Sequence, residues 1–278
     1  MSMATPATDG ARRNRLPPPP LPAAGARWAI LLDVDGTLLD FADDPRTVQP
    51  DTALLQLLHA LHRRLDGALA LVSGRTLADL DRLFAAPHWA AAGVHGLQLR
   101  HADGSGREVA VAPAQQARMH DVARTLAARF DGVQLEDKHA AVALHCRRAP
   151  AQLPALREAA IAAVAQLPGY QLQPGNLVLE FRPAGMDKGY AVLELLQRAP
   201  FAGRWPVYLG DDLTDEHAFA RINAQGGLSV RIGTREPSLA ASTLPGPAAA
   251  EAWLTGVLDA LGAPTHARSP EGEPTRQP

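Results

Sequence analysis

A short apolar run near the start of the chain ends in two aspartates. Residues 28–34 read WAILLDV, and the run continues into the segment Asp33-Val34-Asp35-Gly36-Thr37. A continuous apolar run of this length is typical of a strand that is buried on both faces of a parallel sheet. Ligands of open α/β sheets bind at the carboxyl ends of the strands. We therefore expect both carboxylates to face a ligand crevice, where one can attack and the other can move a proton.

Strands and helices alternate after this run. Segment 53–65 carries leucines on one helical face, and the apolar runs 68–74 and 88–96 flank a helix that Thr76 can cap. The same alternation returns beyond Lys188, where helices are expected at 191–199, 215–222 and 251–261 and strands at 205–210 and 227–232. Strand–helix–strand order predicts an α/β fold with a Rossmann-like parallel sheet.

The middle of the chain has a different order. Helix, strand and strand occur twice in succession, at 114–130, 132–138, 140–148, 153–167, 170–174 and 176–183. This order predicts a smaller α+β domain, inserted into the core, with an antiparallel sheet covered by helices on one face. The expected limits are 26–109 and 184–263 for the core and 110–183 for the insertion. The proline-bearing tails, 1–25 and 264–278, are expected to be disordered.

Composition restricts the partners of the chain. Its 278 residues have a formal net charge of -2 and 46% hydrophobic content, so a sizeable core is possible and no basic field exists for nucleic acid or an anionic membrane. The single cysteine, Cys146, excludes an internal disulfide. Neither a signal peptide nor a membrane-spanning run is evident. We expect a cytoplasmic monomer that acts on a small molecule.

A second group of acids follows the expected strand 205–210. The segment Gly210-Asp211-Asp212-Leu213-Thr214-Asp215-Glu216 would repel a phosphate unless a hard cation were present, and oxygen ligands of this kind suit Mg²⁺. Acids near a helix start also have a simpler explanation, because helix N-termini favour them. That explanation covers Thr214 to Glu216 but not Asp211. The segment therefore predicts a magnesium site.

Further polar residues complete a phosphate site. Ser73 and Gly74 follow the second expected strand, and Lys188 opens a helix. A hydroxyl, backbone amides and an ammonium are the groups that surround a transferring phosphoryl. Each is more often an ordinary cap or a solvated charge when it occurs alone. Together with Thr37, they are our candidate phosphate ligands.

The order of these segments resembles the four-motif signature of the haloacid dehalogenase superfamily. A closer similarity, to the trehalose-6-phosphate phosphatase family, rests on LLDVDGTLLD, SGRT, GVHG, LEDK with LHCR, NLVLEFRP with DKG, and GDDLTDEHAF. The resemblance implies a Mg²⁺-dependent phosphatase that releases trehalose and inorganic phosphate from trehalose 6-phosphate. It also implies that the insertion is a cap of the C2B type, in the order α-β-β-α-β-β. Cys146 and Val94 depart from residues common in that family.

The resemblance also implies roles for individual residues. Asp33 would be the nucleophile that forms an aspartyl phosphate, and Asp35 would be the general acid and base. Asp211 would bind Mg²⁺ with Asp33 and the Asp35 carbonyl. The remaining implied residues are Asp212 and Asp215, which would support the metal ligands; Ser73 and Lys188, which would hold the phosphate; and Glu136, Lys138 and Glu180, which would bind sugar hydroxyls.

Several alternatives stay open. A phosphatase for sucrose phosphate or mannosyl phosphoglycerate would have the same core, and a phosphomutase would form the same aspartyl phosphate. A non-catalytic binding protein is disfavoured because every proposed catalytic position holds a competent residue. Without the resemblance, Glu136 and Lys138 would be interpreted as solvent-facing neighbours. Four other residues are interpreted as packing or surface residues, namely His59, His62, Trp89 and His95.

Overall fold

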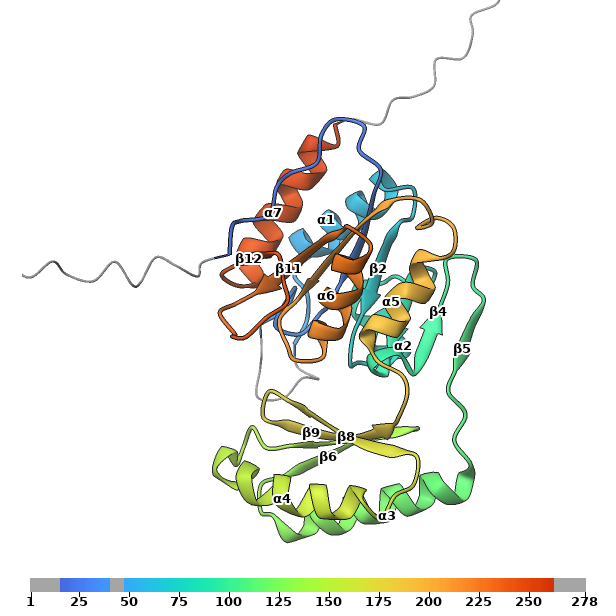
Figure 1. The fold of residues 1–278 in the computed structure, drawn as a ribbon, viewed down its shortest axis with the longest axis vertical. Coiled ribbons are helices and arrows are strands. Elements are labelled where there is room, and N and C mark those ends of the chain that lie inside the picture. Colours follow the sequence, from blue (N-terminus) through green and yellow to red (C-terminus); the bar gives the residue numbers. More distant parts are fainter. Residues whose placement is uncertain (1–15, 41–47, 263–278) are drawn as a thin grey trace, which may run out of the picture.

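A computed structural model describes residues 16–40 and 48–262 of the chain, which form two sheets (Figure 1). The larger sheet has the strand order β12-β11-β10-β1-β2-β3-β4-β5, and the smaller one has the order β6-β7-β9-β8. The segment that forms the smaller sheet lies between β5 and α5 in the chain. The expected α/β core with an inserted α+β cap is therefore confirmed, and we propose residues 110–183 as the limits of the cap.

The first strand lies near the middle of the larger sheet. β1 is buried along its whole length, and it pairs in parallel with β10 and with β2. Parallel pairing continues through β11 and β12 on one side and through β3 on the other, whereas β4 and β5 are antiparallel. The strands are β1 (Trp28–Leu32), β2 (Leu69–Val72), β3 (Ala90–Gly93), β4 (Gln98–Arg100), β5 (Gly106–Glu108), β10 (Trp205–Gly210), β11 (Leu228–Ile232) and β12 (Ser242–Leu244).

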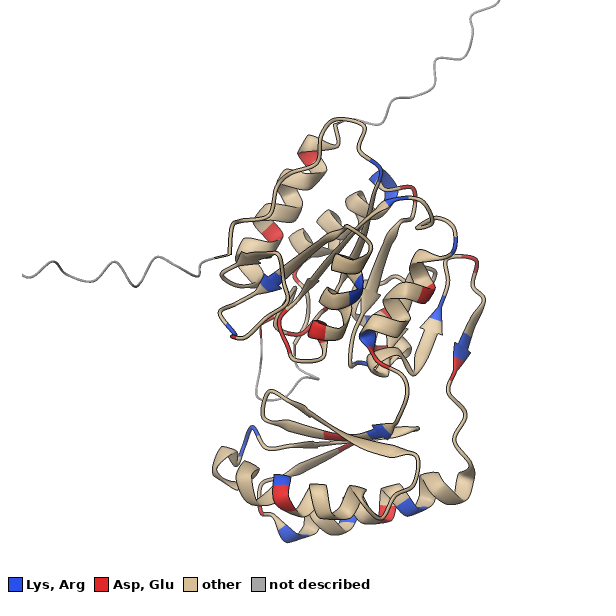
Figure 2. Cartoon of the chain, viewed as in Figure 1, with Lys and Arg blue, Asp and Glu red and all other residues tan. Residues whose placement is uncertain are grey.

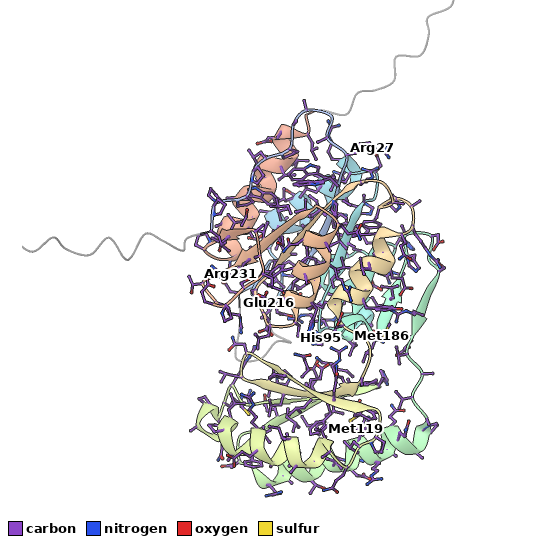
Figure 3. The ribbon with its side chains drawn as sticks, in the orientation of Figure 1. Arg27, His95, Met119, Met186, Glu216 and Arg231 are labelled. Atoms are coloured by element: carbon purple, nitrogen blue, oxygen red, sulfur yellow. The ribbon has the colours of Figure 1, made fainter. Side chains whose placement is uncertain are left out.

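Helices cover both faces of the larger sheet. Helix α1 packs beside α7 and α5 packs beside α6, with one pair on each face (Figure 1). The leucine face expected for segment 53–65 is buried in the core. Figure 3 shows that side chains fill the space between the ribbons of both sheets and their helices. The helices are α1 (Thr52–Arg64), α2 (Leu77–Phe84), α5 (Lys188–Leu196), α6 (Asp215–Ala224) and α7 (Pro247–Ala260), with a short 3₁₀ turn, η1, at Val94–Gly96. Because β1, β2 and β10 are parallel, their carboxyl ends lie at the same edge of the sheet. The residues that follow each of these strands therefore come together at that edge.

The cap has one apolar and one polar face. Val142, Leu144, Leu179 and Phe181 form an apolar cluster with the two cap helices. Residues that alternate with them point the other way, toward the larger sheet. The cap comprises α3 (Pro113–Arg129), β6 (Gln134–Lys138), β7 (Ala141–His145), a 3₁₀ turn at Pro150–Gln152, α4 (Leu153–Val164), β8 (Tyr170–Gly175) and β9 (Val178–Pro183). This is the helix–strand–strand order expected from the sequence.

The start of the described chain differs from the disorder expected for residues 1–25. Pro17 O accepts a hydrogen bond from Thr243 N on β12, and the Trp253 indole donates to Pro19 O and Pro20 O at 3.2 Å. Proline lacks an N–H but keeps its carbonyl acceptor, so an extended proline run can still be fixed in this way. Residues 1–15 and the expected tail at 264–278 lie outside the described residues. No helix among the described residues is long and apolar enough to cross a bilayer.

Candidate active site

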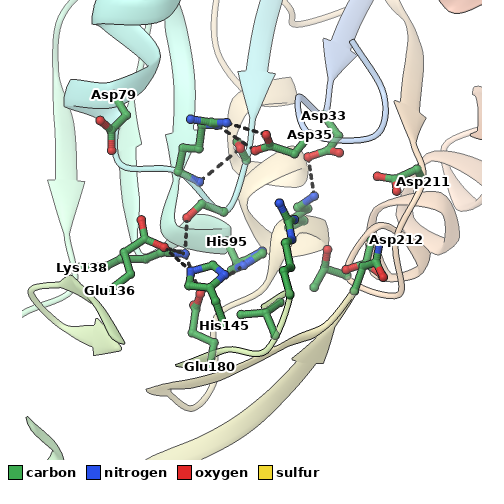
Figure 4. A pocket seen from close by; sticks show the side chains of 18 of the residues that line it. Asp33, Asp35, Asp79, His95, Glu136, Lys138, His145, Glu180, Asp211 and Asp212 are labelled. Carbon is green, nitrogen blue, oxygen red and sulfur yellow. Dashed lines mark hydrogen bonds and ion pairs between the residues drawn. The ribbon is translucent and has the colours of Figure 1, made fainter. Parts of the chain in front are cut away.

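A cleft lies where the carboxyl ends of β1, β2 and β10 face the polar side of the cap sheet (Figure 4). Figure 2 shows acidic segments at this edge of the larger sheet, opposite the charged strands of the cap. Thr37 and Asp215 lie next to the cleft without lining it. The predicted residues that line it are Asp33, Asp35, Ser73, Gly74, Glu136, Lys138, Glu180, Lys188, Asp211 and Asp212.

Asp33 is a buried carboxylate at the end of β1. Its Oδ1 accepts a hydrogen bond from Lys188 Nζ at 2.7 Å, and its Oδ2 accepts one from Thr37 Oγ1 at 3.1 Å. Burial raises the pKa of Asp33 to about 7, although Lys188 acts in the opposite direction. The Thr37 hydroxyl therefore orients Asp33, and its contact with phosphate stays a prediction.

Lys188 bridges Asp33 and Asp215 at the start of α5. Its Nζ lies 2.8 Å from Asp215 Oδ1, and these two carboxylates raise the pKa of Lys188 even though burial alone would lower it. Asp215 also accepts hydrogen bonds from the Tyr208 hydroxyl and from the backbone N–H groups of Asp211 and Asp212. These four bonds match the four acceptor sites of a carboxylate, so Asp215 positions Lys188 and its own loop.

Asp211 forms no ion pair within 4 Å among the described residues, in contrast to Asp33 and Asp215. Its Oδ1 is buried and has no hydrogen-bond partner among the described residues, and carboxylate oxygens of Asp33, Asp211 and Asp215 lie within 4.8 Å of one another. Burial, together with Asp33 and Asp215, raises the pKa of Asp211 to about 10. Oxygen donors crowded in this way fit a hard divalent cation. Because Asp215 is already saturated, Asp33 and Asp211 have the side-chain oxygens left to hold that cation.

Asp35 is held by an arginine to which the sequence analysis gave no role. Arg75 donates from Nε to Asp35 Oδ2 at 2.8 Å and from Nη2 to Asp35 Oδ1 at 2.6 Å. A bidentate contact of this kind fixes the direction of the carboxylate. Gly36 has φ of 86°, which lets the chain turn back directly after Asp35. The signal for Arg75 was present in the motif Ser73-Gly74-Arg75, but its partner lies 40 positions away.

The cap contributes a second polar cluster. Lys138 Nζ donates to Glu180 Oε2 at 2.8 Å and, across the cleft, to Gly74 O at 2.9 Å. Glu136 accepts a hydrogen bond from His145 Nε2 at 2.8 Å. Burial would raise the pKa of Glu180, but Lys138 and His95 outweigh it and hold that pKa well below its usual range. Glu136, Lys138 and Glu180 therefore lie together on the polar face of the cap, and their contact with sugar hydroxyls stays a prediction from the resemblance.

Two buried atoms of this cluster can accept further hydrogen bonds. Glu180 Oε1 and His145 Nδ1 have no partner within the described part of the chain. When His145 donates from Nε2, its Nδ1 carries a lone pair. Unpaired buried acceptors of this kind cost roughly 1–3 kcal/mol each. They suit a ligand that brings hydroxyl donors.

Other predicted and unpredicted residues complete the site. Asp212 Oδ1 accepts a hydrogen bond from Arg235 Nη2 at 2.8 Å, so an arginine holds this carboxylate. His95 lines the cleft and lies 3.6 Å from Glu180, whereas the sequence analysis treated it as a packing residue. His59, His62 and Trp89 do pack together, with His62 stacked on the indole. No local pattern distinguishes His95 from these histidines.

Solved structures share this fold. The C-terminal domain of trehalose-6-phosphate phosphatase from C. albicans matches with a TM-score of 0.74 and 22% identity, over 84% of this chain and 92% of that one. A phosphatase of the haloalkanoate (HAD) enzyme superfamily from Bacteroides thetaiotaomicron matches with a TM-score of 0.57 and 17% identity, over 83% and 93% of the two chains. The fold is that of the HAD-type phosphatases, which are phosphoric monoester hydrolases.

Sequence comparison defines the family within this class. The model of the trehalose-phosphatase family matches residues 31–247. A probable trehalose-phosphate phosphatase of Sinorhizobium fredii is 43% identical over 84% of this chain and 87% of its own length, and the trehalose-6-phosphate phosphatase of Escherichia coli K12 is 40% identical over 86% and 90%. The chain belongs to the trehalose-phosphatase family.

Proposed function

We propose that the chain hydrolyses trehalose 6-phosphate to trehalose and inorganic phosphate in this cleft, with Mg²⁺ as its cofactor. The observation that carries the proposal is the position of the buried Asp33. Its carboxylate accepts a hydrogen bond from Lys188 and lies in the cleft that the polar face of the cap also lines. The names of the relatives from Sinorhizobium fredii and Escherichia coli support the choice of sugar phosphate. Cytoplasmic location and a monomeric state stay predictions from composition.

In the first step, an Asp33 oxygen attacks phosphorus in line with the departing sugar oxygen. The bond from phosphorus to that oxygen breaks, a bond from Asp33 to phosphorus forms, and Asp35 gives its proton to the leaving sugar. Lys188, 2.7 Å from Asp33, offsets negative charge on the transferring group. Mg²⁺ held by Asp33 and Asp211 would supply further charge neutralisation at the phosphoryl oxygens. The product of this step is an aspartyl phosphate.

In the second step, water attacks the aspartyl phosphate and Asp35 accepts the proton of that water. Inorganic phosphate leaves, and the carboxylate of Asp33 is restored. The contact between Arg75 and Asp35 holds the Asp35 carboxylate in one orientation, from which it can accept this proton. Asp35 must lose this contact, or share it, to carry a proton in the first step. One side chain then serves both steps.

The cap supplies the sugar site in this proposal. Glu136, Lys138 and Glu180 face the cleft, and the unpaired acceptor on Glu180 suits a hydroxyl group. Closure of the cap over the core would exclude water from the reacting phosphoryl and hold the sugar. The hydrogen bond from Lys138 to Gly74 O is one contact through which the cap reaches the core.

A substrate panel tests the proposal. We expect phosphate release from trehalose 6-phosphate to exceed that from sucrose 6-phosphate, mannosyl phosphoglycerate and glucose 6-phosphate by at least about 10-fold in kcat/KM, because sites that pair buried polar groups reject substrates that leave them unpaired. A sugar bisphosphate should not be needed for turnover. Preference for another sugar phosphate, or dependence on a bisphosphate, would overturn the assignment in favour of one of the rival activities.

The cap residue Glu136 provides a sharper test of sugar recognition. Glu136→Gln removes a charged acceptor and is expected to lower kcat/KM for trehalose 6-phosphate by about 10- to 100-fold, since a hydrogen bond to a charged group contributes about 1.5–3 kcal/mol. The same variant should change hydrolysis of p-nitrophenyl phosphate, which lacks a sugar, by less than about threefold. Equal losses on both substrates would mean that Glu136 serves the chemistry and not the sugar.

A further inference from the structure

The turn between β3 and β4 has a strained backbone. Val94 and His95 have φ of 47° and 53°, in the left-handed region. A residue with positive φ is uncommon outside glycine, and for a β-branched residue such as valine it is a genuine outlier. Such residues cost of order 1–3 kcal/mol each and persist only where their surroundings impose them. The contacts of this turn therefore need an explanation.

This turn is hydrogen-bonded to residues 73–75, the segment that contains the predicted phosphate ligands Ser73 and Gly74. Val94 N donates to Arg75 O at 2.8 Å, and His95 N donates to Ser73 O at 2.9 Å. The imidazole of His95 also occupies the space beside Gly74, where a Cβ atom would lie 2.6 Å from His95 Nε2. His95 therefore supports the backbone of Gly74 from the core side.

The same imidazole meets the cap. His95 Nε2 lies 3.6 Å from Glu180 Oε2 on β9, and that oxygen also accepts from Lys138, which donates in turn to Gly74 O. Gly74 is thus held by His95 on the core side and by Lys138 on the cap side, and both of these side chains share Glu180. Figure 4 shows these side chains gathered at one end of the cleft.

The turn also packs against the helix that carries Lys188. A Cβ atom on Gly96 would lie 2.8 Å from Asp187 O and 3.2 Å from the Cβ of Ala191 on α5. The His95 carbonyl faces Arg182 of the cap strand β9, whose Nη2 lies 3.4 Å away. One short turn therefore touches the phosphate segment, the start of α5 and the cap.

We infer that His95 is a positioning residue. It couples the position of Glu180 on the cap to the backbone conformation of the phosphate site at Ser73 and Gly74 on the core. The inference rests on the proposed function. When the cap is closed over the core, His95 contacts Gly74 from the core side and Lys138 contacts it from the cap side. When Glu180 withdraws, His95 loses its charged partner and Gly74 O loses the ammonium. Phosphate is then bound tightly only while the cap is closed.

Inorganic phosphate is the probe for this inference, because it binds without a sugar. We expect His95→Ala in the full chain to weaken phosphate binding, measured by calorimetry with Mg²⁺ present, by about 10-fold. The same variant should lower kcat for trehalose 6-phosphate by about 10- to 100-fold, the range expected when a positioned group is displaced. His95→Gln keeps a donor toward Glu180 and should recover part of both losses. It also serves as the test variant if the alanine variant does not fold.

A matched control is available in His101. This histidine is 4% exposed and lies 3.5 Å from Glu194 Oε1, so His101→Ala also removes a buried histidine beside a glutamate, but outside the cleft. We expect it to lower Tm and to leave phosphate affinity unchanged. If His95→Ala behaved in the same way, with a lower Tm and unchanged phosphate affinity, a purely structural role would replace the inference.

The double variant decides whether His95 acts through Glu180. Glu180→Gln should weaken phosphate binding in the native chain and have a smaller effect in the His95→Ala background, because the route through His95 is then absent and only the contact from Lys138 to Gly74 O remains. Independent, additive effects of the two substitutions would overturn the inference. If phosphate binding follows this pattern while another sugar phosphate is the preferred substrate, the proposed function fails and the coupling stands.

Discussion

Asp33→Asn is expected to lower kcat for trehalose 6-phosphate by at least about 10⁴-fold, because an amide cannot form the aspartyl phosphate. Phosphate release under saturating substrate measures the loss. A rapid acid quench of the native chain, followed by mass spectrometry, should find phosphate on the peptide that contains Asp33. The variant should show no phosphate on that peptide. Residual turnover above about one part in a hundred would contradict the assignment of Asp33 as nucleophile.

The Asp33 variant should remain folded. Burial raises the pKa of Asp33 to about 7, so ionising this carboxylate in its buried position is unfavourable and a neutral amide of the same size removes that cost. Lys188 keeps Asp215 as a partner in the variant. Asp51→Asn is a matched control, because Asp51 caps α1 away from the cleft and asparagine caps a helix equally well. It should retain both full activity and the native Tm.

Removal of divalent cations is expected to have the second largest effect. Chelation with EDTA should lower kcat by at least about 10³-fold and added Mg²⁺ should restore it, because the charge on the transferring phosphoryl group then has no divalent cation beside it. Mg²⁺ at about 100 times its Kd should also raise Tm by about 5–10 °C, since binding to the folded state alone stabilises it. Tm therefore reports the metal site independently of turnover.

Asp211→Asn separates the metal site from a general effect of salt. The variant should lose most activity at any Mg²⁺ concentration and should lose the rise in Tm with Mg²⁺. Without metal it should be at least as stable as the native chain, because burial and two neighbouring acids oppose ionisation of Asp211. Asp66→Asn, an exposed aspartate beside Arg204, should keep the native response to Mg²⁺. A full rise in Tm for the Asp211 variant would exclude Asp211 as a ligand.

The sequence was most informative where local pattern determines structure. Asp33 and Asp211 follow apolar runs that are typical of buried strands, and the carboxyl ends of parallel strands lie at one edge of a sheet, so both acids were expected at that edge. The order of elements in the cap followed from periodicity in the same way. The strands β4, β5 and β12 were not predicted, because three residues are too few to show a period.

Contacts between distant side chains could not be predicted. The bidentate bond from Arg75 to Asp35 and the bond from Tyr208 to Asp215 depend on how the strands are stacked, which no local pattern records. His95 differs from other histidines only through the turn that places it beside Gly74. Disorder was predicted for residues 16–25 from their composition alone, and the packing of this segment on Trp253 overrides that prediction.

Residues 16–25 affect how the edge of the larger sheet can interact with other molecules. β12 lies at one end of the strand order of the larger sheet. The carbonyl of Pro17 accepts a hydrogen bond from the N–H of Thr243, which could otherwise pair with a strand of another molecule. Proline cannot extend the ladder any further, because it offers no amide of its own. A chain shortened to start at residue 26 would expose this edge and favour self-association, although every residue of the cleft would still be present.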